Sequence, residues 1–87
     1  MRPDDVLEFL QHRPFQSFRV TLTDGRTYDV RHPEMAMVGR SSMVIGLPAP
    51  GDAARTATAP IYDRAVTVSM LHVMQLESLD AANSSNT

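Results

Sequence analysis

The sequence of 87 residues contains no cysteine and no lysine. The lack of cysteine excludes thiol catalysis, zinc-thiolate sites and disulfide bonds, so cysteine usage indicates no redox compartment. The lack of lysine excludes a Schiff-base lysine and the lysine of a phosphate-binding P-loop. All eight basic residues are therefore arginines. This bias indicates GC-rich coding in the first place, with a selected phosphate-binding surface as the alternative.

The chain also has no excess of positive charge and no long apolar run. Its formal net charge of −2 argues against a strong electrostatic nucleic-acid binder. No apolar run approaches the roughly 18 residues of a membrane span. The start, Met1-Arg-Pro-Asp-Asp5, is acidic and helix-like and does not resemble a signal peptide. We therefore expect a single cytoplasmic domain with no membrane partner, near the lower size limit for independent folding.

Segment 18–30 shows the strongest structural pattern, because its alternation predicts a β-hairpin together with its register. Apolar residues alternate with polar ones on both sides of Asp24-Gly25. A two-residue loop would mix apolar and polar side chains on each face, whereas a three-residue loop with Gly25 in a left-handed conformation keeps them apart. The predicted cross-strand pairs are Phe18 with Val30, Arg19 with Asp29, Val20 with Tyr28, and Thr21 with Thr27.

The predicted domain spans residues 1–79 and begins with a short helix. Pro3 suits the first helical position, and the acidic residues that follow it suit the positive end of the helix dipole. Arg13-Pro14 is expected to end this helix, because a residue before proline avoids helical geometry. His32-Pro33-Glu34 is expected to break the second strand of the hairpin or bend it sharply.

Further strands and two polar segments follow the hairpin. Strand patterns cover residues 35–38, 43–45, 61–62, 66–69 and 72–79, with a tight corner near Met70-Leu71. Residues 48–60 hold three prolines and no large apolar group, which predicts an exposed loop. Residues 80–87 are small and polar, which predicts a disordered tail.

This order of elements predicts a mainly β fold, in which an N-terminal α-helix precedes a small five-stranded barrel. Such short sheets avoid exposed edges by closing or by pairing with another subunit. Five apolar residues are expected to hold the core: Leu22, Tyr28, Val30, Val68 and Leu76.

Two segments resemble the motifs of Sm-like proteins. The stretch Val20-Thr-Leu-Thr-Asp-Gly-Arg-Thr-Tyr28 is similar to their first motif, in which a strand ends in Asp-Gly-Arg. Val66-Thr-Val-Ser-Met70, a corner and Val73-Met-Gln-Leu76 resemble their second motif. The chain also resembles short bacterial proteins with an Arg-Pro-Phe, Asp-Gly-Arg and His-Pro-Glu layout. The resemblance covers about residues 3–79 and implies an SH3-like barrel preceded by a helix.

Sm-like proteins form rings and bind uridine-rich or adenine-rich RNA, so the resemblance implies a ring-like assembly with RNA as a partner. The bacterial RNA-chaperone branch places a Lys-His pair at the last corner, and Leu71-His72 supplies the histidine of that pair. The third-strand motif of the family holds an Asp and an Asn, where this chain has Gly39-Arg-Ser-Ser-Met43.

Four residues are candidates for contact with RNA, and each has a structural alternative. An arginine can bind phosphate, a tyrosine can stack on a base, and a neutral imidazole can stack on a base or donate a hydrogen bond to one. The alternatives are arginines that are solvated or paired with acidic neighbours, and a histidine that caps an apolar strand. An anion-binding patch of Arg31 with Arg40 and Arg64 is a related possibility. The four candidates are Arg40, Tyr62, Arg64 and His72.

The sequence contains no recognisable set of catalytic residues and no residues spaced to bind a metal or cofactor. His32-Pro33-Glu34 offers an imidazole and a carboxylate for proton transfer, but a rigid turn is the favoured interpretation, because no nucleophile or oxyanion donor is identifiable beside it. The three histidines lack metal-ligand spacing. We therefore predict no catalytic residue, no cofactor and no metal site.

Self-association is the function that the pattern favours. Segments 35–38, 43–45 and 70–74 carry large apolar side chains on both strand faces, whereas a small barrel has only one interior. A second copy could cover the other face, with segment 43–47 or 65–69 pairing with the final strand of that copy. The sequence thus predicts a non-enzymatic, self-associating interaction module, with Sm-like RNA binding as the alternative. The predicted interface residues are Val44, Met70 and Met74.

Overall fold

A computed structural model describes residues 1–49 and 62–79, which form a mainly β fold with one N-terminal α-helix, as predicted. The predicted loop 48–60 and tail 80–87 lie outside the described residues, except that Pro48 closes a strand and precedes Ala49. No helix in this described part is long and apolar enough to cross a membrane. The elements are α1 (Pro3–Gln11), β1 (Phe18–Leu22), β2 (Thr27–Val30), η1 (Pro33–Met35), β3 (Ala36–Val38), β4 (Ser42–Pro48), β5 (Tyr62–Ser69), η2 (Met70–His72) and β6 (Val73–Ser78).

Helix α1 begins and ends where the sequence predicts. Pro3 occupies the first turn together with two acidic residues, and the chain becomes extended at His12, just before Arg13-Pro14. Val6 and Leu10 are four residues apart, so they share one helical face, and both are buried. The helix is therefore held by its apolar face, which packs into the core.

The β1–β2 hairpin has the predicted register throughout. Phe18 pairs with Val30, Val20 with Tyr28, and the polar pairs alternate with them. The N–H of Leu22 donates to the carbonyl of Arg26 at 2.8 Å, which leaves a three-residue turn. Gly25 has φ 92° in that turn, a conformation that glycine adopts without steric cost. Side-chain parity and the position of the glycine thus determine the hairpin together.

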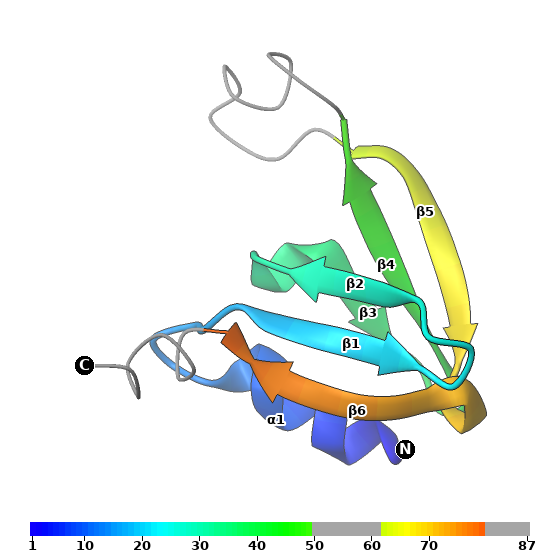
Figure 1. Cartoon of the computed structure of the whole chain (residues 1–87). Coiled ribbons are helices and arrows are strands. Elements are labelled where there is room, and N and C mark those ends of the chain that lie inside the picture. The colour runs from blue at the N-terminus through cyan, green and yellow to red at the C-terminus, as the bar shows by residue number, and fades with distance from the viewer. Residues whose placement is uncertain (50–61, 80–87) are drawn as a thin grey trace.

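The strands form two three-stranded antiparallel sheets. Sheet A has the order β2-β1-β6, and sheet B has the order β3-β4-β5. In Figure 1 the strands of sheet A run side by side above α1, while β4 and β5 rise steeply away from them. Short turns connect the two sheets, through η1 between β2 and β3 and through η2 between β5 and β6.

The predicted number of five strands is wrong, because the described residues form six strands. In this part of the chain, no strand pairing closes the two sheets into the predicted barrel. The extra strand arises at Pro33, which starts η1 and separates β2 from β3. Proline has no N–H to donate to a ladder, so a strand stops or bends there. The N–H of Met35 donates to the carbonyl of His32 at 3.0 Å, which makes this segment a rigid turn, as expected.

The core lies between the two sheets and is sealed at one end by α1. Three aromatic rings gather there, with Phe18 5.1 Å from Phe9 and 6.2 Å from Phe15 between ring centroids. Of the predicted core residues, Tyr28 and Leu76 are only partly buried and pack at its margin. The other predicted core residues are fully part of the buried set, which comprises Val6, Leu10, Phe18, Val20, Leu22, Val30, Met35, Met43, Ile45, Val68, Met70 and Val73.

Candidate interaction surfaces

The 3-10 turn η2 joins several distant parts of the chain at one end of the molecule. The N–H of Met70 donates to the carbonyl of Ser41 at 2.9 Å, and the amino terminus of Met1 donates to the carbonyl of Met70 at 3.0 Å. The carbonyl of His72 accepts from the N–H of Thr23 at 2.8 Å. The middle residue of the turn, Leu71, is 85% exposed. The turn is thus fixed by its backbone while it presents an apolar side chain to solvent.

The four predicted RNA-binding residues are all exposed, but they lie at two separate ends of sheet B. Arg40 and His72 belong to neighbouring turns, because Arg40 precedes Ser41 at the η2 corner. Tyr62 and Arg64 lie at the start of β5, whose eight residues extend for about 23 Å at the usual rise per residue. The fold therefore places two of these residues at each end of sheet B and does not gather all four into one patch.

The arginines of the predicted anion patch differ in their surroundings. Arg31 lies 3.3 Å from the Asp29 carboxylate, which also accepts from Nε of Arg19 at 2.8 Å. The hydrogen bond from Arg19 is the main cause that holds the pKa of Asp29 below its usual range. Within the described part of the chain, Arg40 and Arg64 form no ion pair. Arg31 is thus engaged by a structural carboxylate, while the other two guanidinium groups are available.

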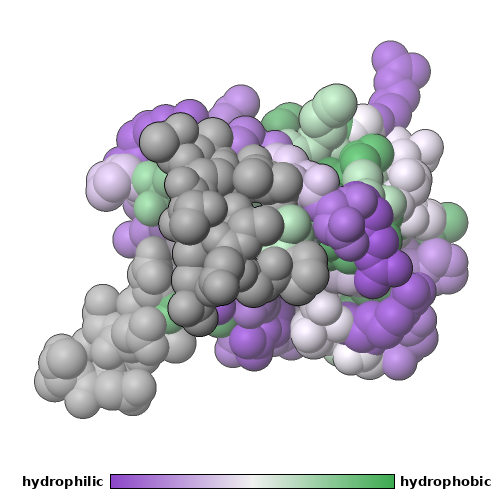
Figure 2. Space-filling model, turned by 90° about the horizontal axis from the view of Figure 1, so that it is seen from above, coloured by the Kyte–Doolittle hydropathy of each residue, from purple (hydrophilic) through white to green (hydrophobic). Residues whose placement is uncertain are grey.

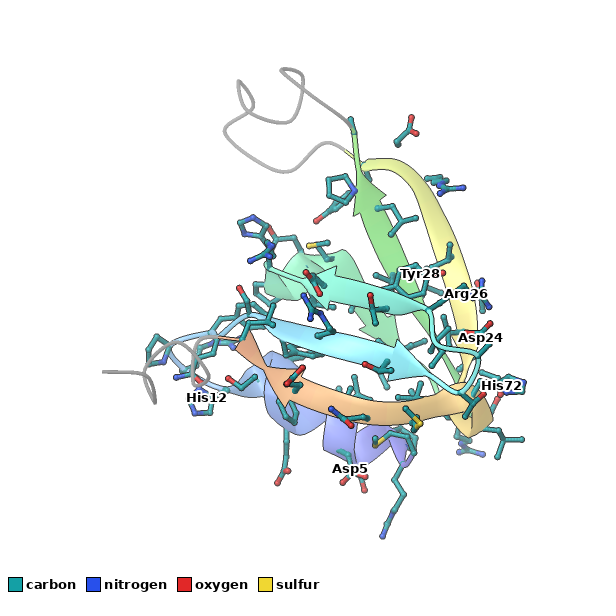
Figure 3. All side chains as sticks on the ribbon, in the orientation of Figure 1. Asp5, His12, Asp24, Arg26, Tyr28 and His72 are labelled. Carbon is teal, nitrogen blue, oxygen red and sulfur yellow. The ribbon has the colours of Figure 1, made fainter. Side chains whose placement is uncertain are left out.

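A cleft of about 280 Å³ opens between the β1–β2 turn and β5, and the sequence patterns do not predict it. Figure 3 shows that Tyr28, Arg26, Asp24 and His72 follow one another along this side of the molecule. Nε of Arg26 donates to the Asp24 carboxylate at 2.8 Å. The backbone N–H of Arg26 also donates to that carboxylate, and this bond is the main cause that lowers the pKa of Asp24. The two charges therefore neutralise each other at the mouth of the cleft.

The histidines belong to different elements of the fold, and His12 and His72 lie at opposite ends of the molecule. His12 follows α1, with Nδ1 2.9 Å from the carbonyl of Pro14, at the end opposite His72 in Figure 3. His32 precedes η1. Residues 1–49 and 62–79 contain no group of three or more His, Cys, Asp or Glu side chains placed to hold a metal ion.

The predicted interface residues are not equally accessible. Met74, on β6, is 57% exposed, and Val44, on β4, is half-buried. Met70 is only 4% exposed and contributes to the core instead of to a surface, because η2 turns its side chain inward. Met37, on β3, is 68% exposed and is not among the predicted interface residues, although the sequence indicates that segment 35–38 is apolar on both faces. Figure 2 shows, on one face of the molecule, hydrophobic side chains in green between hydrophilic ones in purple.

The outer face of sheet B carries a shallow apolar groove of about 290 Å³, called the outer groove here. Met43 and Ile45 point into the core, so Val44 and Gly46, which alternate with them along β4, face outward. Glycine leaves room there for the ring of Tyr62, since a Cβ on Gly46 would lie 2.9 Å from that ring. The groove is lined by Glu34, Met35, Ala36, Met37, Val44, Gly46, Tyr62, Arg64 and Ala65.

Two charged residues, Glu34 and Arg64, are among the residues that line the outer groove. Glu34 lies just before β3, and Arg64 lies on β5, on the other side of the central strand β4. Partial burial of Tyr62 is the main cause that raises its pKa, and the negative charge of Glu34 adds to the effect. Within the described residues neither Glu34 nor Arg64 has an ion-pair partner. Because Arg64 pairs with Leu47, which has the same orientation as Ile45, its side chain leaves β5 on the core side, and the free charge on the outer face is that of Glu34.

No family model, curated protein or solved structure matches this chain. The Sm-like resemblance remains a prediction, and the function has to be inferred from the surfaces themselves.

Proposed function

We propose that the chain is a non-enzymatic interaction module that self-associates, with β5 of one copy pairing along β6 of the next. The observation that carries the proposal is the state of these two strands. β5 pairs only with β4 and β6 only with β1 in the described residues, so each leaves one edge of unpaired N–H and C=O groups. Such edges are a template for pairing with another chain unless they are covered.

The lengths and side chains of the strands favour this pair of edges over the others. β5 has eight residues and β6 has six, whereas the other two edge strands, β2 and β3, have only four and three. A longer strand offers more hydrogen bonds to a partner. Exposed apolar side chains lie on or beside β6, at Met74 and Leu71. The predicted alternative, segment 43–47, has no free edge for another copy, because β4 already pairs with β3 on one side and with β5 on the other.

The geometry also bears on the number of copies. An edge of β5 that pairs with a different edge, that of β6, forms a heterologous contact. Each copy then keeps a second unsatisfied edge, so association continues until a ring closes or a filament grows. We therefore propose an assembly of more than two copies, in accordance with the ring that the Sm-like resemblance implies.

Met74→Lys tests the proposed edge pairing. Because Met74 is 57% exposed, the substitution is expected to leave the fold intact while it places a strongly hydrated charge at the β6 edge. Molar mass measured by light scattering should fall towards that of a single copy. Thr27→Lys, on the exposed face of β2, is the matched control and should keep the native mass. An unchanged mass for Met74→Lys, with unchanged circular dichroism, would contradict pairing at this edge.

RNA binding is the second candidate, and it is supported by the available charges of Arg40 and Arg64. Arg40 and His72 occupy neighbouring turns, so a short single strand could contact both. Arg40→Ala should weaken binding of short uridine-rich or adenine-rich RNA, and binding should weaken steeply with added salt. Fluorescence anisotropy measures this, and Arg31→Ala is the control because Asp29 already engages Arg31. Equal anisotropy with and without the protein at low salt would exclude this candidate.

A further inference from the structure

A pocket of about 390 Å³ opens between the end of α1 and the end of β6, and it shares no residue with the cleft or with the outer groove. Its volume is in the range of small-molecule sites. The labelled His12 marks this end of the molecule in Figure 3. The pocket is lined by Glu8, Phe9, His12, Gln16 and Ser78. One half-buried aromatic ring thus lies among four polar side chains.

The helical repeat brings three of these side chains together. Residues three and four apart are neighbours on a helix surface, which is the spacing of Phe9 and of Glu8 from His12. Val6 and Leu10 form the buried face of α1 instead. The last turns of the helix therefore present a carboxylate, an aromatic ring and an imidazole side by side.

The walls of the pocket are fixed by contacts between distant parts of the chain. The ring of Phe9 lies 5.1 Å, between centroids, from that of the completely buried Phe18. Phe18 in turn pairs with Ser78 across β1 and β6. The N–H of Leu79 donates to the carbonyl of Ser17 at 2.9 Å. These contacts hold the end of β6 against the segment that follows α1, so the pocket is formed before a ligand binds.

The hydrogen bond of His12 determines what its other ring nitrogen does. Nδ1 lies 2.9 Å from the carbonyl oxygen of Pro14, which only accepts. Nδ1 therefore carries the hydrogen, and Nε2 of the neutral ring has a free lone pair. The carboxylate of Glu8 also only accepts, and within residues 1–49 and 62–79 it forms no ion pair. The pocket thus offers two acceptors, one of them charged.

The neighbouring positive charge does not occupy the pocket. Arg13 directly follows His12, but its Nη1 donates to the carbonyls of Leu10 and His12, and Arg13 does not line the pocket. The amide of Gln16 both donates and accepts, so it adapts to either kind of ligand group. With a neutral imidazole, the charge of the lining residues is therefore the negative charge of Glu8.

We propose that this pocket binds a small organic cation that consists of a primary ammonium group on an apolar body. An ammonium group has three N–H donors and no acceptor, so it donates to the Glu8 carboxylate and to Nε2 of His12 at once. The apolar body lies on the ring of Phe9, away from water. The face of that ring also attracts a positive charge. An anion would instead be repelled by Glu8.

Glu8→Gln tests the site, with phenethylamine as the probe. The substitution keeps the shape of the side chain and removes its charge, so the affinity should fall by roughly tenfold or more. Asp5→Asn is the matched control, because it removes a negative charge from an exposed residue of α1 that does not line the pocket and lies away from His12 in Figure 3. It should keep the native affinity. Titration followed by NMR, through the amide signals of residues 8–16, measures the binding.

Two further probes separate the contribution of charge from that of the apolar body. Phenethyl alcohol keeps the ring and lacks the charge, whereas ethylamine keeps the charge and lacks the ring. Each should bind to the native chain roughly tenfold more weakly than phenethylamine, or weaker still. Equal affinities of the native chain for the amine and the alcohol would overturn the proposal. Equal affinities of the native chain and Glu8→Gln for phenethylamine would do so as well.

The outcomes are independent of the proposed self-association, because all lining residues of the pocket belong to one copy. Light scattering on the same samples gives the molar mass. A monomeric chain that binds phenethylamine in the predicted order of variants overturns self-association and supports the pocket. An oligomeric chain whose signals do not shift with phenethylamine overturns the pocket and leaves self-association intact.

Discussion

Phe18→Ala is expected to lower the free energy of unfolding by about 3–5 kcal/mol, the usual cost of removing a buried aromatic side chain. Phe18 is completely buried, and its ring contacts those of Phe9 and Phe15. Its loss leaves a cavity at the point where α1, β1 and the segment between them meet. A small domain has a total stability of the order of 5–15 kcal/mol, so the variant should be near its folding limit at room temperature.

Urea unfolding followed by circular dichroism measures this effect. Phe15→Ala is the matched control, because the same side chain is removed from a half-buried position and the expected loss is smaller. Both variants have to be compared at the same protein concentration, since self-association adds stability by mass action. Equal losses for the two variants would show that Phe18 is not the centre of the aromatic cluster.

A carboxylate introduced at Met43 is expected to unfold the chain, whereas the same group at Val44 is expected to be tolerated. Met43 is completely buried between the sheets, and burial of an unpaired charge costs several kcal/mol even after relaxation. Val44 is the next residue of β4 and points to the opposite face, into the outer groove. The pair of substitutions therefore reports which face of β4 is the core.

Thermal unfolding of Met43→Asp and Val44→Asp provides the comparison. Met43→Asp should lack a cooperative transition above room temperature, while Val44→Asp should unfold cooperatively. Two folded variants of equal stability would mean that β4 is inserted in a different register.

The β1–β2 hairpin was predictable because two independent constraints agree on it. Side-chain parity excludes a two-residue loop, and Gly25 supplies the conformation that a three-residue loop needs. The break at Pro33 was predictable from the chemistry of proline. Its consequence for the strand count was not, since the same residue permits either a bend or a new strand. Local rules thus located the turns and left the number of strands open.

The candidate surfaces were less predictable because they depend on distances between segments far apart in the chain. Segments 35–38 and 43–45 do not alternate between apolar and polar residues, which indicates two apolar faces. The sequence does not indicate which residue of each segment faces solvent. Met70 and Met74 both belong to segment 70–74, which the sequence indicates as apolar on both faces, and η2 buries the first while β6 exposes the second. The gathering of Glu34, Val44 and Tyr62 along the outer groove brings together segments far apart in the chain, which composition does not reveal.

The molar mass of the native chain in solution tests self-association most directly. Light scattering over a range of micromolar concentrations should give a defined multiple of the 9.6 kDa mass of one copy, and this multiple should exceed two. A mass of one copy at every concentration would contradict the account, because the free edges of β5 and β6 would then remain uncovered in solution.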